Sequence, residues 1–181
     1  MLDDQRLRDK FEKDLNDMEG MIRATWDFMR GAEQYESVQP VDIMDLLESL
    51  KADAQDMGRE VNIVGTALLS YSGKPMALKR CISNLIDKAI QYGQRATIEI
   101  REGADQLMLV IRGQGPGIPD AQLEQVFEPF YRLESSRSRD SGGTGLGLSI
   151  ARNIAQAHGG RLTLKNASTV ELEAMLTLPR Q

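Results

Sequence analysis

Two glycine-rich segments of the sequence could bind a phosphate-containing ligand. RGQGPGIP, residues 112–119, places Gly113, Gly115 and Gly117 directly after a run of residues typical of a strand. Glycines at such a position allow tight turns and a close approach of the backbone to a ligand. GGTGLGLSI, residues 142–150, precedes and opens an expected helix, whose free N–H groups and positive dipole end favour anions. Neither segment has the spacing of a Walker A loop or of a dinucleotide-binding GxGxxG motif, so those two phosphate-binding folds are disfavoured.

A helix and a loop carry the other polar residues of interest. NLIDKAIQYG, residues 84–93, places Asn84, Lys88 and Gln91 on one side of a helix. FEPFYRLESSRSRDSGG, residues 127–143, begins with aromatic residues and continues with a polar stretch that contains arginines. That composition is typical of a mobile lid able to close over phosphates, and a merely solvated loop is the competing interpretation.

The elements that must position these segments follow from hydrophobic periodicity and from helix and turn signals. We expect a helix that is capped by Asp42 and stops at Gly58, a second helix that opens at Pro75 and buries Cys81, and a third over residues 146–157. The expected strands are EVNIVG (60–65), ALLSY (67–71), RATIEIRE (95–102), QLMLVIRG (106–113), GRLTLKN (160–166) and TVELEAMLTLP (169–179), with a hairpin turn at 103–105. Helices on one side of a sheet whose other side is wet predict an α+β fold, a two-layer α/β sandwich.

The N-terminal segment has the pattern of a separate long helix. Residues 3–35 lack proline, and apolar residues recur every three or four positions at Leu7, Phe11, Leu15, Met18, Ile22, Thr25 and Met29. A helix of that length would overhang a domain of the remaining size, so a helical bundle is favoured over packing on its own domain. Residues 31–40 read as a linker. We therefore predict a bundle segment at 1–37, which makes a homodimer through this helix, and a second domain at 38–181.

Composition excludes several classes of protein. The chain has 181 residues and a net charge of -5, so it carries no global basic field for nucleic acid or for an anionic membrane. One cysteine and one histidine cannot form an internal disulfide or the usual four-ligand zinc site. No apolar run approaches a membrane span, and the N-terminus is too charged for a signal peptide. We expect a cytoplasmic location, without membrane contact by this segment.

Taken in order, these segments resemble the ATP-binding catalytic domain of bacterial sensor histidine kinases, in the superfamily that includes the ATPase domains of gyrase, MutL and Hsp90. The resemblance covers residues 40 to 180: NLIDKAIQYG is similar to the N box, RGQGPGIP to the first glycine box, FEPFYR to the F box and GGTGLGLSI to the second glycine box. The N-terminal helix resembles the second helix of the dimerisation hairpin. The resemblance implies that the parent protein contains the whole hairpin, pairs with a response regulator, and is cytoplasmic or the cytosolic part of a membrane-bound sensor.

The resemblance also implies a set of nucleotide-binding residues. Adenine would lie near Tyr92 and the first glycine box, and the phosphates near the second glycine box. By position, the implied ATP-binding residues are Asn84, Lys88, Gln91, Tyr92, Gly113, Gly115, Gly117, Ile118, Phe130, Arg132, Gly143, Thr144, Gly145, Leu146, Gly147 and Leu148. Active members transfer the γ-phosphoryl group of ATP to a histidine on the first helix of the hairpin.

Three departures from the family pattern predict that ATP binding is weak or lost and make Mg²⁺ binding doubtful. Lys88 replaces the N-box Asn that holds Mg²⁺, and an ammonium has no acceptor atom for a cation. Gln91 replaces a basic residue that faces the phosphates, so Lys88 could contact phosphate instead. Gly113 replaces the Asp that recognises the adenine amino group. Substitutions that arose naturally and substitutions that were introduced would both give this pattern. If Lys88→Asn and Gly113→Asp together raised ATP affinity more than tenfold, the pocket would be otherwise intact.

The single histidine, His158, is not followed by an acidic residue, as a phosphoacceptor histidine would be, and it lies at the end of a helix, where a structural role is favoured. Three functions stay open. The chain is the catalytic portion of a histidine kinase with impaired nucleotide chemistry, a pseudokinase in the limiting case. It is a nucleotide-independent dimerisation or regulatory module. It is a kinase acting in trans on a hairpin of another chain.

Overall fold

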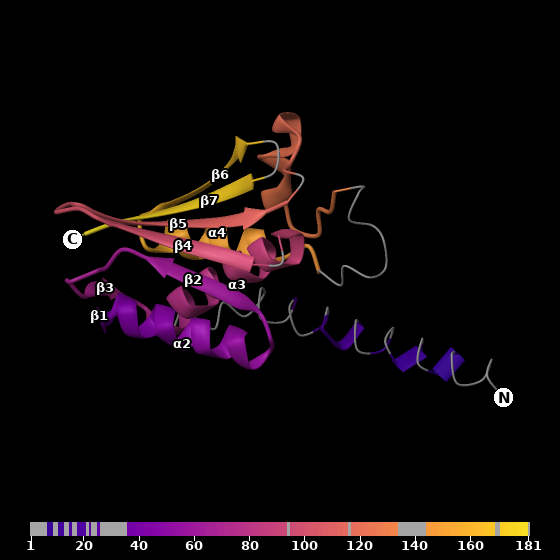
Figure 1. Ribbon diagram of the computed structural model, residues 1–181, viewed down its shortest axis with the longest axis horizontal. Coiled ribbons are helices and arrows are strands. Elements are labelled where there is room, and N and C mark those ends of the chain that lie inside the picture. The colour runs from indigo at the N-terminus through magenta and orange to yellow at the C-terminus, as the bar shows by residue number, and fades with distance from the viewer. Residues whose placement is uncertain are drawn as a thin grey trace.

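The computed structural model describes residues 36–93, 95–115, 117–133, 144–168 and 171–180, together with residues 7–8, 11–12, 15, 18–20, 22 and 25. Figure 1 shows the described part from residue 36 onward as a sheet with helices packed below it. The described residues of the two glycine-rich segments lie at one end of this sheet, where β5 (Gln106–Gln114) ends and α4 (Gly147–Ala157) begins.

The larger sheet has five strands in the order β2-β4-β5-β7-β6. β2 pairs with β4 in parallel, and the other neighbouring pairs are antiparallel. The parallel pair is possible because a long connection that includes α3 separates β2 from β4 in the chain. The strands are β2 (Glu60–Val64), β4 (Arg95–Glu102), β5 (Gln106–Gln114), β6 (Arg161–Ser168) and β7 (Glu171–Pro179).

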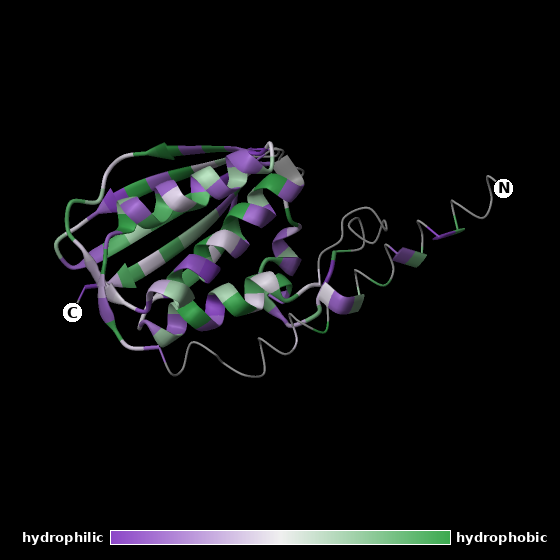
Figure 2. Cartoon of the chain, turned by 90° about the horizontal axis from the view of Figure 1, so that it is seen from below, coloured by the Kyte–Doolittle hydropathy of each residue, from purple (hydrophilic) through white to green (hydrophobic). Residues whose placement is uncertain are grey.

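Three helices cover one face of this sheet, and Figure 2, seen from the helix side, shows them lying across the strands. They are α2 (Ile43–Asp56), α3 (Pro75–Gly93) and α4 (Gly147–Ala157), and two short 3₁₀ helices, η2 (Asp120–Gln122) and η3 (Gln125–Phe127), follow β5. The predicted two-layer α/β sandwich is confirmed.

The helix boundaries follow local signals that the sequence contains. The Asp42 carboxylate accepts a hydrogen bond from the Asp45 N–H at 3.0 Å, which caps α2. Gly58 adopts a φ of 70° just beyond the last residue of α2, as expected of a glycine that ends a helix. Pro75 opens α3, where its missing N–H costs nothing.

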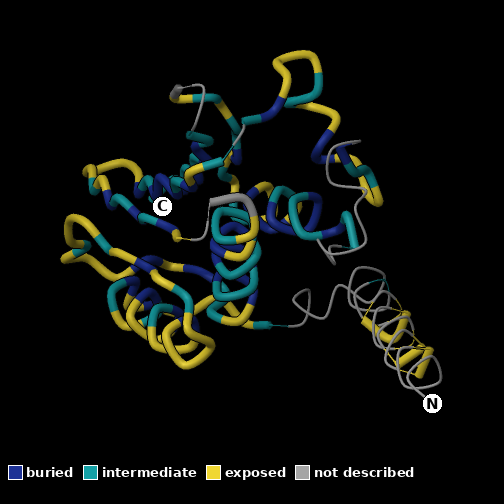
Figure 3. The backbone as a smooth tube through the Cα atoms, turned by 45° about the vertical axis from the view of Figure 1, so that its right-hand side comes forward, coloured by how far each residue is buried: buried dark blue, intermediate teal, exposed yellow. Residues whose placement is uncertain are grey.

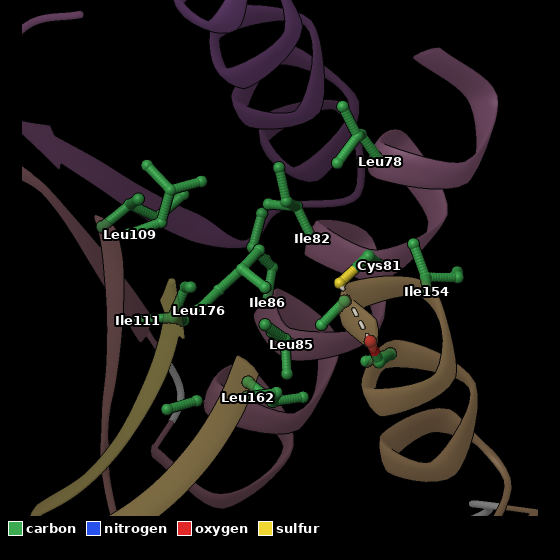
Figure 4. Close-up of a cluster of buried hydrophobic side chains, with 14 of the residues drawn as sticks. Leu78, Cys81, Ile82, Leu85, Ile86, Leu109, Ile111, Ile154, Leu162 and Leu176 are labelled. Carbon is green, nitrogen blue, oxygen red and sulfur yellow. Dashed lines mark hydrogen bonds between the residues drawn. The ribbon is translucent and has the colours of Figure 1, made fainter. Parts of the chain in front are cut away.

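The core lies between the helices and the sheet, and Figure 3 shows buried residues concentrated where the two layers meet. α3 contributes most to it through one apolar stripe, and Figure 4 shows Leu78, Ile82 and Leu85 of that stripe facing strand and α4 residues. Cys81 is fully buried, as predicted, and its Sγ donates to the Ala151 carbonyl at 3.4 Å. α3 and α4 are thereby held side by side at the end of the sheet that carries the glycine segments.

The outer face of the sheet carries a row of alternating charges. The Glu99 carboxylate pairs with Arg101 and Arg112 at 2.6 Å each, Arg112 also pairs with Glu173 at 2.6 Å, and Glu173 pairs with Lys165 at 2.9 Å. Hydrogen bonds from Arg101 and Arg112 lower the pKa of Glu99 to about 2. We call these five residues the outer charge row.

Two predicted elements differ from the structure. Of the expected strand at 67–71, only Tyr71 is extended, in β3 (Tyr71–Gly73), because the Leu68 and Leu69 N–H groups donate to the Glu102 carboxylate at 2.7 and 3.2 Å instead of to a strand. The predicted linker at 31–40 ends in a strand, since β1 (Gln39–Val41) pairs with β3 in a separate two-stranded sheet.

The N-terminal segment is helical at each of its described residues between 7 and 25. The rest of the helix expected over 3–35 lies outside the described residues. Five apolar side chains of the predicted seam are more than half exposed: Leu7, Phe11, Leu15, Met18 and Ile22. In the part of the chain that the structure describes, no helix combines the length and the apolar character needed to cross a bilayer.

Candidate functional site

A cavity opens between the C-terminal half of α3, the end of β5, residues 131–133 and the start of α4. Most of its lining is apolar, with one charged and polar edge formed by Lys88, Gln91 and Arg132. The apolar lining residues are Leu85, Ala89, Ile111, Ile118, Val126, Leu133, Leu148, Leu164, Leu172 and Ala174. The cavity therefore suits a ligand with an apolar body and an anionic end.

Seven of the predicted binding residues line this cavity: Lys88, Gln91, Gly113, Ile118, Arg132, Gly145 and Leu148. Asn84, Gly115, Gly117, Phe130, Thr144, Leu146 and Gly147 lie around the cavity without forming its lining. Tyr92 belongs to α3, but its side chain lies outside the described residues, as does the whole of Gly143.

Lys88 and Gln91 lie side by side on α3, as their spacing predicts. The Lys88 ammonium donates to Gln91 Oε1 at 3.1 Å. Burial lowers the pKa of Lys88, the positive charge of Arg132 lowers it further, and the Asp87 carboxylate opposes the shift. Lys88 and Arg132 are thus close enough to repel each other, and an anion between them would relieve that repulsion.

This edge does not fit a divalent cation. Ammonium and guanidinium groups have only donors, and Mg²⁺ needs oxygen ligands. Gln91 Oε1 already accepts from Lys88, and the nearby Asp87 carboxylate pairs with Arg59 at 2.9 Å. Across the described residues no group of three or more His, Cys, Asp and Glu side chains could hold a metal ion.

The start of α4 lies next to Asn84 of α3. A Cβ atom on Gly147 would lie 3.6 Å from Asn84 Oδ1, so the two elements are in contact at this point. Asn84 Nδ2 is buried and has no hydrogen-bond partner among the described residues. Leu146, at the N-cap position of α4, offers no side-chain cap and is itself completely buried. A buried donor beside an uncapped helix N-terminus favours an anion.

A contact between Phe130 and Gly145 joins the residues that follow η3 to the start of α4. Both have positive φ, 65° and 73°, and the Phe130 N–H donates to the Gly145 carbonyl at 3.0 Å. A Cβ on Gly145 would lie 2.8 Å from the Phe130 carbonyl carbon, so this contact requires glycine. Phe130 is 53% exposed and is not part of the cavity lining.

Asn166 of β6 is a site residue that sequence reasoning missed. Its Oδ1 accepts from the Ile118 N–H at 3.0 Å, and its Nδ2 donates to the Ile118 carbonyl at 2.8 Å and to Asp120 at 3.0 Å. Gly117 has a φ of 70°, and a Cβ there would lie 2.7 Å from Asn166 Oδ1. Asn166 therefore fixes the first glycine segment against the sheet, and a lone asparagine in a strand gives no signal of that role.

Gly113 lies directly beneath α3. A Cβ atom on this residue would lie 2.6 Å from the Ala89 carbonyl oxygen and 2.7 Å from its Cα. No side chain fits at position 113 unless α3 moves away from β5. An Asp side chain at position 113 would therefore clash with the Ala89 backbone, so reversal of Gly113 also tests whether α3 can move away from β5.

His158 occupies a structural position, as its place at a helix end predicts. Its Nδ1 lies 2.8 Å from the Ile154 carbonyl oxygen, and its Nε2 accepts from the Lys74 N–H at 3.1 Å. These partners require the tautomer with the proton on Nδ1. The imidazole joins the end of α4 to the residue that precedes α3.

Comparison with known proteins agrees with this site. Residues 73–181 match the family described as histidine kinase-, DNA gyrase B- and HSP90-like ATPases. The chain is 42% identical over 180 residues to the sensor histidine kinase GtrS of Pseudomonas aeruginosa, which covers 99% of this chain and 37% of that protein. It is 32% identical to the sensor protein CutS of Streptomyces coelicolor, with 83% of this chain and 38% of that protein covered. The chain thus spans less than two fifths of these relatives.

Solved structures share the fold. The mycobacterial sensor histidine kinase MprB superposes with a TM-score of 0.65 at 27% identity over 80% of this chain and 98% of that chain. Full-length ShkA in complex with AMPPNP superposes with a TM-score of 0.78 at 20% identity over 98% of this chain and 39% of that one, which shows the fold alone.

Proposed function

Because the chain belongs to the family of histidine kinase-, DNA gyrase B- and HSP90-like ATPases, we propose that it is the ATP-binding catalytic portion of a sensor histidine kinase with weakened, Mg²⁺-independent nucleotide binding. The observation that carries this proposal is the pair of cations at the edge of the cavity, Lys88 and Arg132. The ATP phosphates lie between this pair, the buried Nδ2 of Asn84 and the start of α4, and the base enters the apolar part of the cavity.

The charge balance at the cavity edge explains the expected lack of Mg²⁺ dependence. In a magnesium site, the cation offsets the phosphate charge and is held by oxygen ligands. Lys88 supplies positive charge at this position without such a ligand, so it replaces the charge of the ion and not its coordination geometry. A divalent cation placed next to Lys88 and Arg132 adds to their repulsion.

Titration of a fluorescent ATP analogue with Mg²⁺ and with EDTA tests the proposal. We expect dissociation constants that differ by less than about threefold between the two conditions. Lys88→Asn, which restores a side-chain acceptor, should make binding depend on Mg²⁺. Lys79→Asn is the matched control, since Lys79 also lies on α3 but is not part of the cavity lining. Its ammonium pairs with the Asp53 carboxylate at a distance of 3.1 Å. Tight binding that requires Mg²⁺ in the unmodified chain contradicts the proposal.

Phosphoryl transfer, where it occurs, needs a histidine from another chain or from the rest of the parent protein. The only histidine of the sequence, His158, is engaged at the end of α4. A kinase acting in trans is therefore the active alternative. Transfer of radiolabel from γ-labelled ATP to a separately supplied dimerisation hairpin supports this alternative. A hairpin that stays unlabelled contradicts it and leaves the catalytic portion with impaired nucleotide chemistry as the proposed function.

A nucleotide-independent dimerisation module is the second candidate, and the exposed apolar seam of the N-terminal segment favours it. Leu7, Phe11, Leu15, Met18 and Ile22 are each more than half exposed on described helical residues. We propose that these side chains pack in a homodimer within the parent protein, which also engages a response regulator. Light scattering and co-purification with a full hairpin test this module, and a monomer that captures no hairpin contradicts it.

A further inference from the structure

We propose that the cavity accepts purine nucleoside triphosphates without discriminating between an amino and an oxo group on the ring. The inference rests on the proposed function, because it assumes that the ring of a nucleotide enters the apolar part of the cavity. It goes further in stating which feature of the ligand the chain does not recognise. Three observations on the cavity floor, on Gly113 and on the polar side chains carry it.

The floor of the cavity is made of apolar side chains from three neighbouring strands. The strand register places Ile111 of β5 beside Ala174 of β7 and Gly113 beside Leu172, with Leu164 of β6 next to Ala174. Side chains alternate between the two faces of a strand, so the intervening residues point to the opposite face. On that face, the Glu173 carboxylate of the outer charge row pairs with both Arg112 and Lys165.

Gly113 brings no polar group into the cavity from its own position. Its backbone lies between two paired strands, opposite Ala96 on one side and Leu172 on the other, so its N–H and C=O point along the sheet. The space on its helix side is filled by the Ala89 backbone, 2.6 Å from where a Cβ would stand. A side chain that could accept a hydrogen bond from a ring amino group is excluded at this point.

The polar side chains of the lining are either cationic or already bound to another side chain. Lys88 donates to Gln91 Oε1 at 3.1 Å, and the Tyr131 hydroxyl donates to Gln125 at 3.1 Å. No carboxylate occurs among the described lining residues. A site built to hydrogen-bond one group rejects analogues that lack it by a large factor, whereas an apolar site separates them weakly. Amino- and oxopurines should therefore bind about equally.

Competition against the bound fluorescent ATP analogue, with ATP, ITP and inorganic tripolyphosphate, tests the inference. We expect ATP and ITP to displace the analogue with dissociation constants within about threefold, and tripolyphosphate to be more than tenfold weaker, because it lacks the ring. ATP that binds tenfold or more tightly than ITP overturns the inference while the proposed function stands. Tripolyphosphate that matches ATP also overturns it, since the ring then makes no contact with the cavity. If none of the three displaces the analogue, both proposals fail.

Two substitutions in β7 test whether the cavity can be made to discriminate between ATP and ITP. Leu172→Asp places an acceptor on the cavity floor beside Gly113, and it should make ATP bind more than about fivefold more tightly than ITP. Thr177→Asp puts the same carboxylate on the same strand but on the outer face, beside Arg161, and should leave the ratio near one. A ratio that changes equally in both variants, or in neither, counts against the ring position that the inference assumes.

Discussion

Asn166 of β6 is hydrogen-bonded to both backbone polar groups of Ile118, at 3.0 Å to the N–H and 2.8 Å to the carbonyl. Ile118 lines the cavity, whereas Asn166 does not. One side chain of the sheet thus replaces the backbone partners that a strand would have given this part of the loop. We infer that Asn166 is a positioning residue for the proposed nucleotide site.

We predict that Asn166→Ala weakens binding of the ATP analogue by up to about thirtyfold, because two hydrogen bonds worth about 1 kcal/mol each no longer hold Ile118 against the cavity. Asn166→Asp keeps an acceptor for the Ile118 N–H but places a carboxylate oxygen against the Ile118 carbonyl and the Asp120 carboxylate, so its affinity should fall at least as far as that of Asn166→Ala. Fluorescence titration measures the change, with Thr163→Ala on the same strand as the control. Equal affinity in all four proteins would show that Ile118 is held without Asn166.

The Lys88 ammonium should destabilise the folded domain and at the same time strengthen ligand binding. Burial and Arg132 lower its pKa, so the folded state holds the Lys88 proton less tightly than the unfolded chain does. The stability of the unmodified domain therefore rises with pH as the pH passes from the lowered pKa toward the usual 10.5. Lys88→Met removes this cost, and we predict a higher urea midpoint at pH 7 together with weaker binding of the ATP analogue.

The two readouts of Lys88→Met separate function from structure. Urea unfolding at pH 7 gives the stability, and titration of the analogue gives the affinity, with Lys79→Met on the same helix as control. A variant that is both less stable and unchanged in affinity would mean that the ammonium serves the fold. The binding affinity of the unmodified protein should also fall as pH rises and Lys88 loses its charge, and this fall should be absent in Lys88→Met.

The parts of the fold that sequence reasoning predicts are those determined by local signals. Asp42, Gly58 and Pro75 mark helix ends through their own hydrogen-bonding and φ preferences, and the structure agrees at each. The expected strand at 67–71 failed because its N–H groups bind Glu102, a residue more than thirty positions away. Pairing of that kind depends on tertiary structure, which local propensity does not contain.

The candidate site likewise contains one contact that the sequence predicts and another that it does not. The spacing of Lys88 and Gln91 on one helix predicts their contact, and the hydrogen bond between them confirms it. The close approach of Ala89 to Gly113 joins two elements whose distance no pattern in the chain reveals. For that reason the dependence of helix packing on glycine at position 113 could not be predicted from the sequence.

The outer charge row predicts acid sensitivity of the sheet. The folded-state pKa of Glu99 is about 2, below its usual 4.5, so its stabilising contribution is complete above pH 4.5 and is lost as the pH falls toward 2. We predict that Glu99→Gln lowers the urea midpoint at pH 7 and loses less further stability between pH 4.5 and pH 2 than the unmodified chain does. Low ionic strength is needed because salt screens exposed pairs.

Glu128→Gln, at an exposed carboxylate just after η3, is the control for Glu99→Gln. It should leave the urea midpoint at pH 7 unchanged. If the two variants have the same midpoints across this pH range, the outer charge row does not stabilise the sheet.

His158 should affect folding and leave phosphate chemistry unchanged. Its imidazole accepts from the Lys74 N–H and donates to the Ile154 carbonyl, and so ties the end of α4 to the start of α3. His158→Phe keeps a ring next to Tyr71, whose centroid lies 6.2 Å away, but loses both hydrogen bonds. We predict that it lowers the free energy of unfolding by about 1–3 kcal/mol, because the Lys74 N–H loses its partner, whereas the Ile154 carbonyl still accepts from the backbone N–H of residue 158 at 3.2 Å. Urea unfolding measures this loss. The unmodified chain, incubated with γ-labelled ATP, should carry no label on His158, and a labelled His158 together with unchanged unfolding of His158→Phe would reverse the assignment and make this histidine the phosphoacceptor.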